Sequence, residues 1–327
     1  MKNIVLEYLK STDGYVSGEE ISNNLNVSRT SIWKNIKKLK ELGYNIESSS
    51  KKGYRLVSDC DVITGEEITP HLNTKYIGRS IIFHKEIGST NDEVSILAKK
   101  GEGEGLVVLA DAQTKGRGRL SRVWEDVKGD NIAMSILLRP SIPPFMAPGI
   151  TQIVALSVLE GLEKSTGLEF SIKWPNDIIL NSKKVCGILT EMDGEMDKLN
   201  YIIVGIGINV NQEKFSDEIS HKATSVYLEK GLKVARSEII GAILNSFEVN
   251  YELFKEKGIL EFINRLKASS ALIGKDVTIS NPFKTYSGRV VDIDNEGYLV
   301  VVDENGLTQS VVGGDISIRG QNGYVPQ

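Results

Sequence analysis

Four apolar runs rich in β-branched residues limit the fold of this chain more than any other feature. Their sequences are IIFHKEI (81–87), LVVLADA (106–112), NIAMSILL (131–138) and NYIIVGIGINV (200–210), and each composition predicts a strand. One long helical pattern covers roughly 149–164, and further helices are expected near 237–257 and 259–271. Because the strands outnumber the helices between them, regular β-α-β alternation fails. We therefore predict a mixed α+β body.

The first 57 residues show three helical patterns followed by a hairpin pattern. Ser28 is expected to cap the third helix, which ends at Gly43, and YNIESSSKKGYRLV (44–57) reads as two short strands around a polar tip. Helix, helix, tight turn, basic helix and hairpin together predict a winged helix-turn-helix. The apolar stripes expected to face inward are Ile4, Val5, Tyr8 and Leu9, then Ile21 and Leu25, then Ile32, Ile36 and Leu39.

This N-terminal module is basic although the chain as a whole is acidic. Residues 1–57 hold ten Lys/Arg and six Asp/Glu, a charge of +4, so the −4 of the whole chain leaves −8 for the rest. The asymmetry favours DNA as the partner of this module, most simply as a dimer, over a basic solvated helix in a small interaction domain. The residues expected at the DNA are Ser28, Arg29, Thr30, Lys34, Lys37, Lys38, Lys51 and Lys52.

Length and composition exclude several classes of protein. With 327 residues and 40 % hydrophobic content, two or three domains are expected. No apolar run reaches the ~18 residues of a membrane span, and MKNIVLEYLK lacks the features of a signal peptide, so we expect a cytoplasmic protein without membrane contact. Cys60 and Cys186 indicate no disulfide framework, and the three histidines show no metal-ligand spacing. GxxxxGK[ST], GxGxxG and a catalytic triad are not visible.

Four stretches place polar or charged side chains beside glycines or strands. In GSTNDE (88–93), Thr90 and Glu93 fit a capping box. TKGRGRLSRVW (114–124) gathers three arginines and a lysine on a flexible loop suited to nucleic acid, a small anion or solvent. KWPND (173–177) reads as a strand end, and KKVCGILTE (183–191) puts Lys184 ahead of an apolar strand. Taken singly, each stretch also has a purely structural interpretation.

Taken together, these stretches resemble the bifunctional biotin operon repressors and biotin–protein ligases. The matching residues are GSTN at 88–91, Gln113, GRGR at 116–119 with Arg122 and Trp124, KWPND, Lys184-x-x-Gly187 and GIGIN at 205–209. The N-terminal module resembles that of the repressor-type members, and 272–319 resembles their SH3-like barrel. The resemblance implies a DNA-binding domain (1–60), a class II synthetase-like catalytic domain (61–271) and a C-terminal domain (272–327). The polar and acidic composition of SDCDVITGEEIT (58–69) predicts a linker. Leu120 and Ser121 depart from members that continue with arginine and glycine.

The implied reaction joins biotin to ATP with Mg²⁺, forms biotinyl-5′-AMP, and transfers biotin to a lysine of a biotin carboxyl carrier protein. Two unit charges ~4 Å apart repel by ~4 kcal/mol at an effective dielectric of ~20, so cations must meet the substrates. Catalytic roles are expected for Arg117, Arg119 and Lys184. Biotin is expected at Ser89, Thr90, Asn91, Gln113, Arg117, Gly118, Arg119, Lys184 and Gly187, and the nucleotide at Arg122, Trp124, Lys173, Asn176, Asp177 and Asn209, with Asp177 as the one candidate beside Mg²⁺.

The resemblance also implies regulation, in which the adenylate acts as corepressor and promotes a homodimer on operator DNA. Three alternatives remain at this stage: a transcription factor with an inactive sensing body, a lipoate ligase, and a ligase whose winged helix no longer regulates. The intact cationic loop and Lys184 argue against a mere sensor, because a sensor needs no groups that handle phosphate.

Overall fold

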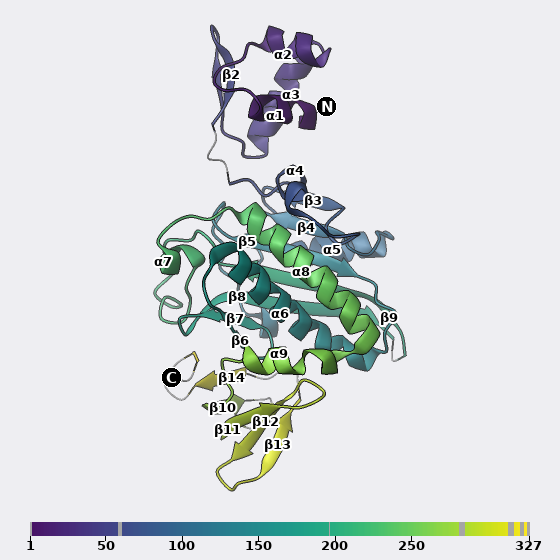
Figure 1. The fold of residues 1–327 in the computed structure, drawn as a ribbon, viewed down its shortest axis with the longest axis vertical. Coiled ribbons are helices and arrows are strands. Elements are labelled where there is room, and N and C mark those ends of the chain that lie inside the picture. The colour runs from purple at the N-terminus through teal and green to yellow at the C-terminus, as the bar shows by residue number, and fades with distance from the viewer. Residues whose placement is uncertain are drawn as a thin grey trace.

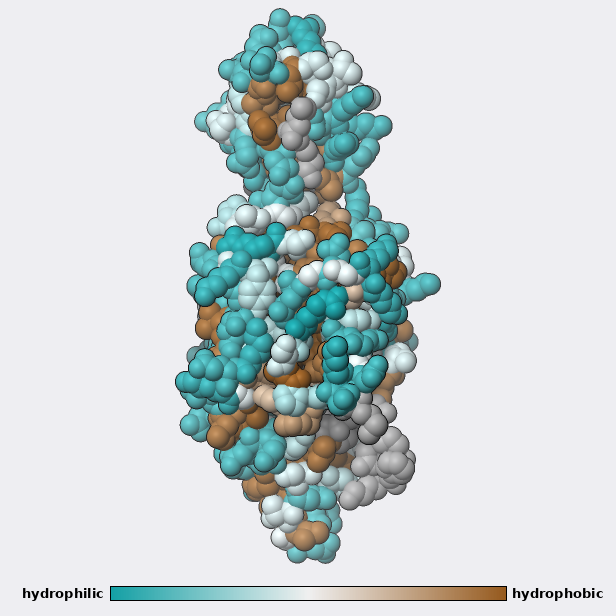
Figure 2. All heavy atoms as spheres, turned by 90° about the vertical axis from the view of Figure 1, so that its right-hand side faces the viewer, coloured by the Kyte–Doolittle hydropathy of each residue, from teal (hydrophilic) through white to brown (hydrophobic). Residues whose placement is uncertain are grey.

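The computed structural model describes residues 2–57, 61–195, 197–280, 285–312, 317–320 and 324–325. Three parts follow one another along its long axis: an N-terminal module, a large central body and a small C-terminal β-structure (Figure 1). A narrow waist separates the N-terminal module from the body (Figure 2).

The N-terminal module is the winged helix that the sequence predicts. Ser28 caps the third helix by accepting a hydrogen bond from the Ser31 amide at 3.2 Å. Val5, Leu6 and Leu9 form the inward stripe of the first helix, whereas Ile4 is 56 % exposed, so the predicted stripe was wrong at that position. The elements are α1 (Lys2–Lys10), α2 (Gly18–Leu25), α3 (Arg29–Glu41), β1 (Ile46–Ser49) and β2 (Gly53–Leu56).

The segment expected to be a linker is largely part of the body. Residues 58–60, including Cys60, lie outside the described residues, but 61–71 form α4 (Gly65–Ile68) and η1 (Thr69–His71). Ile63 and Ile68 are fully buried in the core of the body. The linker prediction was therefore wrong for 61–69, because two isoleucines among acidic residues supply an apolar face that packs against the body.

The same segment joins the winged helix to the body. Val62 packs into the core of the N-terminal module, and the Tyr44 hydroxyl donates to Glu67 Oε1 at 2.8 Å. Asp61, from the same segment, accepts from Arg236 Nε at 2.7 Å, and the Arg236 side chain is 1 % exposed. The waist is thus built from specific contacts on both sides.

The body is built on a seven-stranded sheet with the order β3-β4-β5-β9-β8-β7-β6. β3 and β4 are parallel, and the other neighbouring pairs are antiparallel. All four apolar runs form strands, so the α+β prediction is confirmed. The strands are β3 (Ile81–His84), β4 (Val107–Ala110), β5 (Ile132–Leu138), β6 (Ser171–Lys173), β7 (Asp177–Leu180), β8 (Lys183–Gly194) and β9 (Leu199–Ile208).

Two long helices, α6 (Ala147–Thr166) and α8 (Arg236–Lys257), pack together across one face of this sheet (Figure 1). A Cβ on Gly161 would meet the Ile243 backbone at 2.8 Å, so the glycine permits their close approach. Contrary to the expectation from the sequence, Pro144–Thr166 has the length and mean hydropathy of a membrane span. The helix is mostly buried in the body, as befits a core helix.

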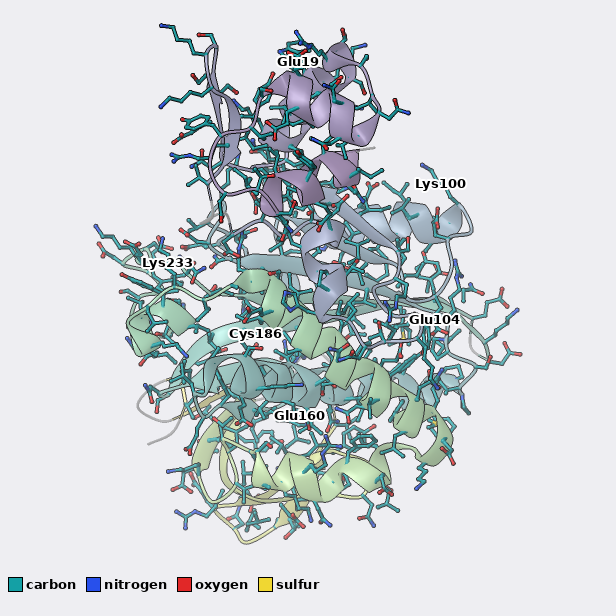
Figure 3. All side chains as sticks on the ribbon, turned by 45° about the horizontal axis from the view of Figure 1, so that its top comes forward. Glu19, Lys100, Glu104, Glu160, Cys186 and Lys233 are labelled. Atoms are coloured by element: carbon teal, nitrogen blue, oxygen red, sulfur yellow. The ribbon has the colours of Figure 1, made fainter. Side chains whose placement is uncertain are left out.

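Shorter helices complete the body: α5 (Thr90–Lys99), α7 (Val226–Lys230) and α9 (Ile263–Ala268), with 3-10 turns η2 (Arg119–Ser121), η3 (Pro144–Met146) and η4 (Ile259–Phe262). α5 packs on the sheet face opposite α6 and α8, where Val94 and Ala98 contact Val108 and Leu137 in a separate apolar cluster. Cys186 lies inside the body as a free thiol (Figure 3), and burial raises its pKa.

The C-terminal part is an antiparallel sheet with the order β13-β12-β11-β10-β14. Its strands are β10 (Asp276–Ser280), β11 (Thr285–Ile293), β12 (Leu299–Asp303), β13 (Thr308–Val311) and β14 (Ser317–Gly320), and DNEG and ENG form the expected turns. The core of this sheet is continuous with that of the body through Val277, Ile279 and Leu299. The Trp174 indole also donates to the Gly297 carbonyl at 2.9 Å, which anchors the small sheet to the body.

Candidate active site

A cavity of about 820 Å³ opens on the sheet face that carries α5. α5 covers only part of this face. Beyond it the strands present Ser135, Gly187, Gly205 and Gly207, whereas their sequence neighbours, such as Ile136, Ile188 and Ile206, belong to the main core. A Cβ on Gly205 would lie 2.3 Å from Asn91 Oδ1, and one on Gly207 would lie 2.6 Å from Trp124 Cε2. The glycines of GIGIN thus let the Asn91 amide and the Trp124 indole lie directly against the sheet at the cavity wall.

Every residue that the sequence predicted to bind biotin or nucleotide lies on the wall of this cavity. They come from the start of α5, from strands β6, β7 and β8, and from loops in distant parts of the chain. They are Ser89, Thr90, Asn91, Gln113, Arg117, Gly118, Arg119, Arg122, Trp124, Lys173, Asn176, Asp177, Lys184, Gly187 and Asn209.

One end of the cavity is a buried polar network at the start of α5. The Thr90 amide donates to Gln113 Oε1 at 2.8 Å, and the Ser135 hydroxyl lies 2.7 Å from the Thr90 hydroxyl. Asn91 Nδ2 donates to Glu191 Oε2 at 2.6 Å. These fixed donors and acceptors suit a small ligand with amide-like groups.

The capping-box prediction for this helix was wrong in its details. The helix does begin at Thr90, but the N-cap is Ser89, whose side chain makes no capping hydrogen bond. The Thr90 hydroxyl instead lies 3.1 Å from Gln113 Oε1. Tertiary partners have taken over the groups that a local cap would use.

The cationic loop lines the cavity, and two of its three arginines, Arg117 and Arg119, contact residues of the body. Arg117 lies 2.8 Å from Asp92 and 3.0 Å from Glu191. Burial lowers the pKa of Arg117, but these two carboxylates outweigh it and raise the pKa overall. Arg119 donates to Asn176 Oδ1 at 3.0 Å, which ties the loop to KWPND.

The departures at Leu120 and Ser121 fall where the loop turns most sharply. Both residues adopt left-handed backbone conformations, with φ of 56° and 54°. A glycine, as in the members noted above, would adopt this conformation without strain. Leu120 is 47 % exposed and lines the cavity, so it adds an apolar group to the wall that the loop forms.

The other end of the cavity holds a row of charged side chains. Lys184 Nζ lies 2.6 Å from Asp177 Oδ1 and 5.5 Å from the centre of the Trp124 ring. Burial would raise the pKa of Asp177, but the Lys184 ammonium and the Tyr324 hydroxyl hold it below its usual value. Asp177 therefore stays ionised and holds the Lys184 ammonium in place.

KWPND ends a strand, as the sequence predicts, and forms the turn of a hairpin. Lys173 ends β6, and Asp177 begins β7. Asn176 Nδ2 donates to the Ile188 carbonyl at 2.8 Å, which fixes this side chain against β8. Asn209 is likewise held, because its amide donates to the Thr224 carbonyl at 3.0 Å.

Sequence reasoning missed three polar residues at this site. Ser135 interrupts the apolar strand β5, and Glu191 follows the apolar run within β8, so both could have been suspected from the polar breaks in IAMSILL and KKVCGILTE. Tyr324 lies near the C-terminus, outside every motif, yet it lines the cavity. Across the described residues no group of three or more His, Cys, Asp or Glu could hold a metal ion.

All eight residues expected at DNA are exposed on the N-terminal module. Arg29 forms an ion pair with Glu19, and Lys37 Nζ lies 5.8 Å from the centre of the Trp33 ring. Trp33 is 55 % exposed on the same helix and was not predicted to take part. The wing lysine Lys52 stacks on Tyr15, with 5.5 Å between Nζ and the ring centre.

Three family models match the chain. The Biotin/lipoate A/B protein ligase family matches 85–209, an HTH domain matches 2–55, and the Biotin protein ligase C terminal domain matches 272–319. These matches cover the cavity, the winged helix and the small β-structure in turn.

Full-length relatives match as well. The Bifunctional ligase/repressor BirA of Bacillus subtilis (strain 168) is 38 % identical over 97 % of this chain and 98 % of its own length. The protein of the same description from Escherichia coli (strain K12) is 28 % identical over 93 % of this chain and 92 % of its own. The solved biotin protein ligase from Aquifex aeolicus in complex with biotin and ATP superposes with a TM-score of 0.67 at 32 % identity, covering 74 % of this chain and 100 % of that one.

Proposed function

The chain belongs to the family of bifunctional biotin ligase/repressors, and from this premise we propose how its cavity carries out the ligase reaction and how its winged helix responds. The protein is a biotin–protein ligase that uses biotin and ATP, and it is also a DNA-binding repressor. We propose three domains, at 1–60, 61–271 and 272–327. We also propose that the protein acts in the cytoplasm. The observation that carries the site assignment is the meeting of all fifteen predicted ligand residues on one cavity.

The reaction takes place in two steps, adenylate formation and biotin transfer. A carboxylate oxygen of biotin attacks the α-phosphorus of ATP, and diphosphate leaves, which gives biotinyl-5′-AMP. The amine of a carrier-protein lysine then attacks the acyl carbon, an amide forms, AMP leaves and the amine loses a proton. Neither step needs a nucleophile from the protein, so the residues of the cavity act by binding, orienting and neutralising charge.

Biotin occupies the α5 end of the cavity. Its ureido ring meets Ser89, Thr90, Asn91 and Gln113, whose buried donors and acceptors suit amide-like groups. Gly116–Arg119 cover the tail and the carboxylate, with Gly187 leaving room on the strand beneath. The Gln113 side chain exchanges its partner Thr90 for the ligand or holds both.

The nucleotide occupies the charged end of the cavity. Lys184 bridges the biotin carboxylate and the α-phosphate, while Arg117, Arg119 and Arg122 reduce the repulsion between the two anions. Trp124 supports the adenine or the loop. Lys173, Asn176, Asp177 and Asn209 line the phosphate side.

Magnesium enters with the nucleotide rather than in a site of the protein's own. Asp177 at this end is already paired with Lys184 at 2.6 Å, and among the described residues no group of three or more His, Cys, Asp or Glu could hold a metal ion. Mg²⁺ brought in with the nucleotide would supply positive charge at the leaving diphosphate. Asp177 is the residue that would contact it.

The loop at 115–124 closes over the adenylate and excludes water until the acceptor lysine arrives. Release of diphosphate on adding biotin, ATP and Mg²⁺, followed by transfer of labelled biotin to a carrier-domain lysine, tests the ligase reaction. Lipoate in place of biotin is the control substrate. Transfer of lipoate at the same rate would contradict the assignment of biotin.

The repressor role depends on the adenylate as corepressor. Ordering of the loops by biotinyl-5′-AMP creates a dimer face, and the dimer presents two winged helices to a two-part operator through the eight exposed residues of the N-terminal module. The carrier protein competes for that face. Analytical ultracentrifugation with and without adenylate, and a biotin-dependent shift of promoter DNA, test this role. An unchanged mass together with an unchanged shift would contradict it.

A further inference from the structure

Tyr324 reaches the charged end of the cavity from the far end of the chain. It lines the cavity together with Lys173, Asp177 and Lys184, which come from β6, β7 and β8. The next residue, Val325, is 7 % exposed, so this short stretch packs against the protein instead of projecting from it.

The Tyr324 side chain contacts two charged groups at once. Its hydroxyl donates a hydrogen bond to Asp177 Oδ2. Its ring lies under the ammonium of Lys173, with 3.4 Å between Nζ and the ring centre. One aromatic side chain thus meets an anion with its polar end and a cation with its face.

Both of these charged groups need such partners. Lys173 is 4 % exposed, and the side chain of Asp177 is 13 % exposed. A buried charge is costly unless it is paired, and the electron-rich face of an aromatic ring attracts a desolvated ammonium. A hydroxyl donor likewise favours the ionised form of a carboxylate.

Asp177 transmits the contact to Lys184. One oxygen of the carboxylate lies 2.6 Å from Lys184 Nζ, and the other accepts from Tyr324. With both oxygens engaged, the carboxylate has one orientation, and Lys184 is directed by it. Lys184 is the residue assigned above to the carboxylate and the α-phosphate.

We propose that Tyr324 is a positioning residue of the ligase site: by holding Asp177 and covering Lys173, it fixes the geometry in which Lys184 meets the substrates. The C-terminal end of the chain then completes the adenylation site. The inference rests on the proposed function. It predicts a defect in adenylate formation, because transfer from a finished adenylate does not require the phosphate side to be aligned.

The test compares Tyr324→Phe, which removes the hydroxyl and keeps the ring, with Tyr324→Ala, which removes both. Tyr298→Phe is the matched control, because Tyr298 belongs to the same C-terminal part and packs on the core away from the cavity. Three quantities are measured in the full-length protein: the rate of diphosphate release, the rate of biotin transfer from added biotinyl-5′-AMP to a carrier domain, and the unfolding midpoint.

Tyr324→Phe is expected to slow diphosphate release about tenfold, the order of one hydrogen bond to a charged group, and Tyr324→Ala more. The rate of biotin transfer from added adenylate should stay within twofold of the wild-type rate. The unfolding midpoint should stay within a few degrees of the wild-type value. Equal losses in both steps would overturn the proposal in favour of a general structural role. Faster diphosphate release would overturn it in favour of a tail that blocks the site. Wild-type rates in both variants would overturn it for Tyr324 alone, whereas a wild-type chain releasing no diphosphate would overturn the ligase reaction itself.

Discussion

Lys184 Nζ lies 2.6 Å from Asp177 Oδ1, and the two residues come from neighbouring antiparallel strands that close one end of the cavity. The pair keeps a cation and an anion together where two anionic substrates must meet. Replacing either partner leaves the other buried without its counter-charge.

Lys184→Ala is expected to slow adenylate formation by about 10²–10³, the size found when one charge-stabilising donor is removed from an active site. The free energy of unfolding should fall by less than the activation free energy of adenylate formation rises. The reason is that the Lys184 side chain is 26 % exposed and Asp177 can take up a proton in the variant. Lys183→Ala is the control, since Lys183 is the adjacent lysine and does not line the cavity. An adenylation rate equal to that of the control would remove Lys184 from the mechanism.

Gly207→Ala is expected to displace the Trp124 indole, because the new Cβ would lie 2.6 Å from Cε2 of that ring. The loop should then close poorly, with faster loss of bound biotinyl-5′-AMP and faster proteolysis at 115–124 when biotin and ATP are present. Gly103→Ala is the matched change, since a Cβ there would meet nothing within 4 Å. The assignment of Trp124 to loop closure fails if both variants retain the adenylate equally.

Ser121→Gly is expected to relieve the left-handed strain at φ 54°, worth roughly 1 kcal/mol. If that strain is present in the closed loop, the glycine variant should release biotinyl-5′-AMP about two- to fivefold more slowly, a part of the ~1 kcal/mol involved. Ser121→Ala removes the hydroxyl and keeps the strain, so it should release the ligand at the wild-type rate. If both variants release the ligand more slowly than the wild type by the same factor, the hydroxyl and not the backbone sets the rate; wild-type release from Ser121→Gly would contradict the role of the strain.

Asp126→Asn is expected to stabilise the protein in a pH-dependent way. Burial raises the pKa of Asp126 to about 6, although hydrogen bonds from the Gln113 amide and Asn131 oppose the shift. Because the pKa of Asp126 is higher in the folded state than in the unfolded state, ionisation of Asp126 lowers the free energy of unfolding. This destabilisation is complete above pH 6 and disappears as the pH falls toward 4.

The asparagine variant should therefore gain about 1–3 kcal/mol in unfolding free energy at pH 8 and little at pH 4.5. Its carbonyl oxygen can still accept from the Gln113 amide, which donates to Asp126 Oδ2 at 3.0 Å in the wild type. Denaturant unfolding at several pH values measures the difference, with Asp217→Asn, a change at an exposed carboxylate, as control. A gain that does not vary with pH would contradict the raised pKa.

Local patterns in the sequence were enough to predict most helices and strands. The Ser28 cap and the Ile32, Ile36 and Leu39 stripe act within one helix, so neighbours in sequence decide them. The same logic failed at Thr90, whose hydroxyl found Gln113 and Ser135 instead of its own helix. The linker prediction at 61–69 was also wrong, because it relied on the acidic residues there although Ile63 and Ile68 are buried.

By itself the sequence determined the order of the elements, the basic winged helix and the chemical types of side chain available for binding two anions, because periodicity, charge and motif spacing are properties of the linear chain. Only the tertiary structure decided that Arg117 pairs with Asp92 and Glu191, that Asp61 meets Arg236, and that Tyr324 contacts Asp177 and Lys173. These partners are far apart in sequence. They meet because burial of the apolar faces brings distant segments into contact, and buried charges must then find counter-charges within reach.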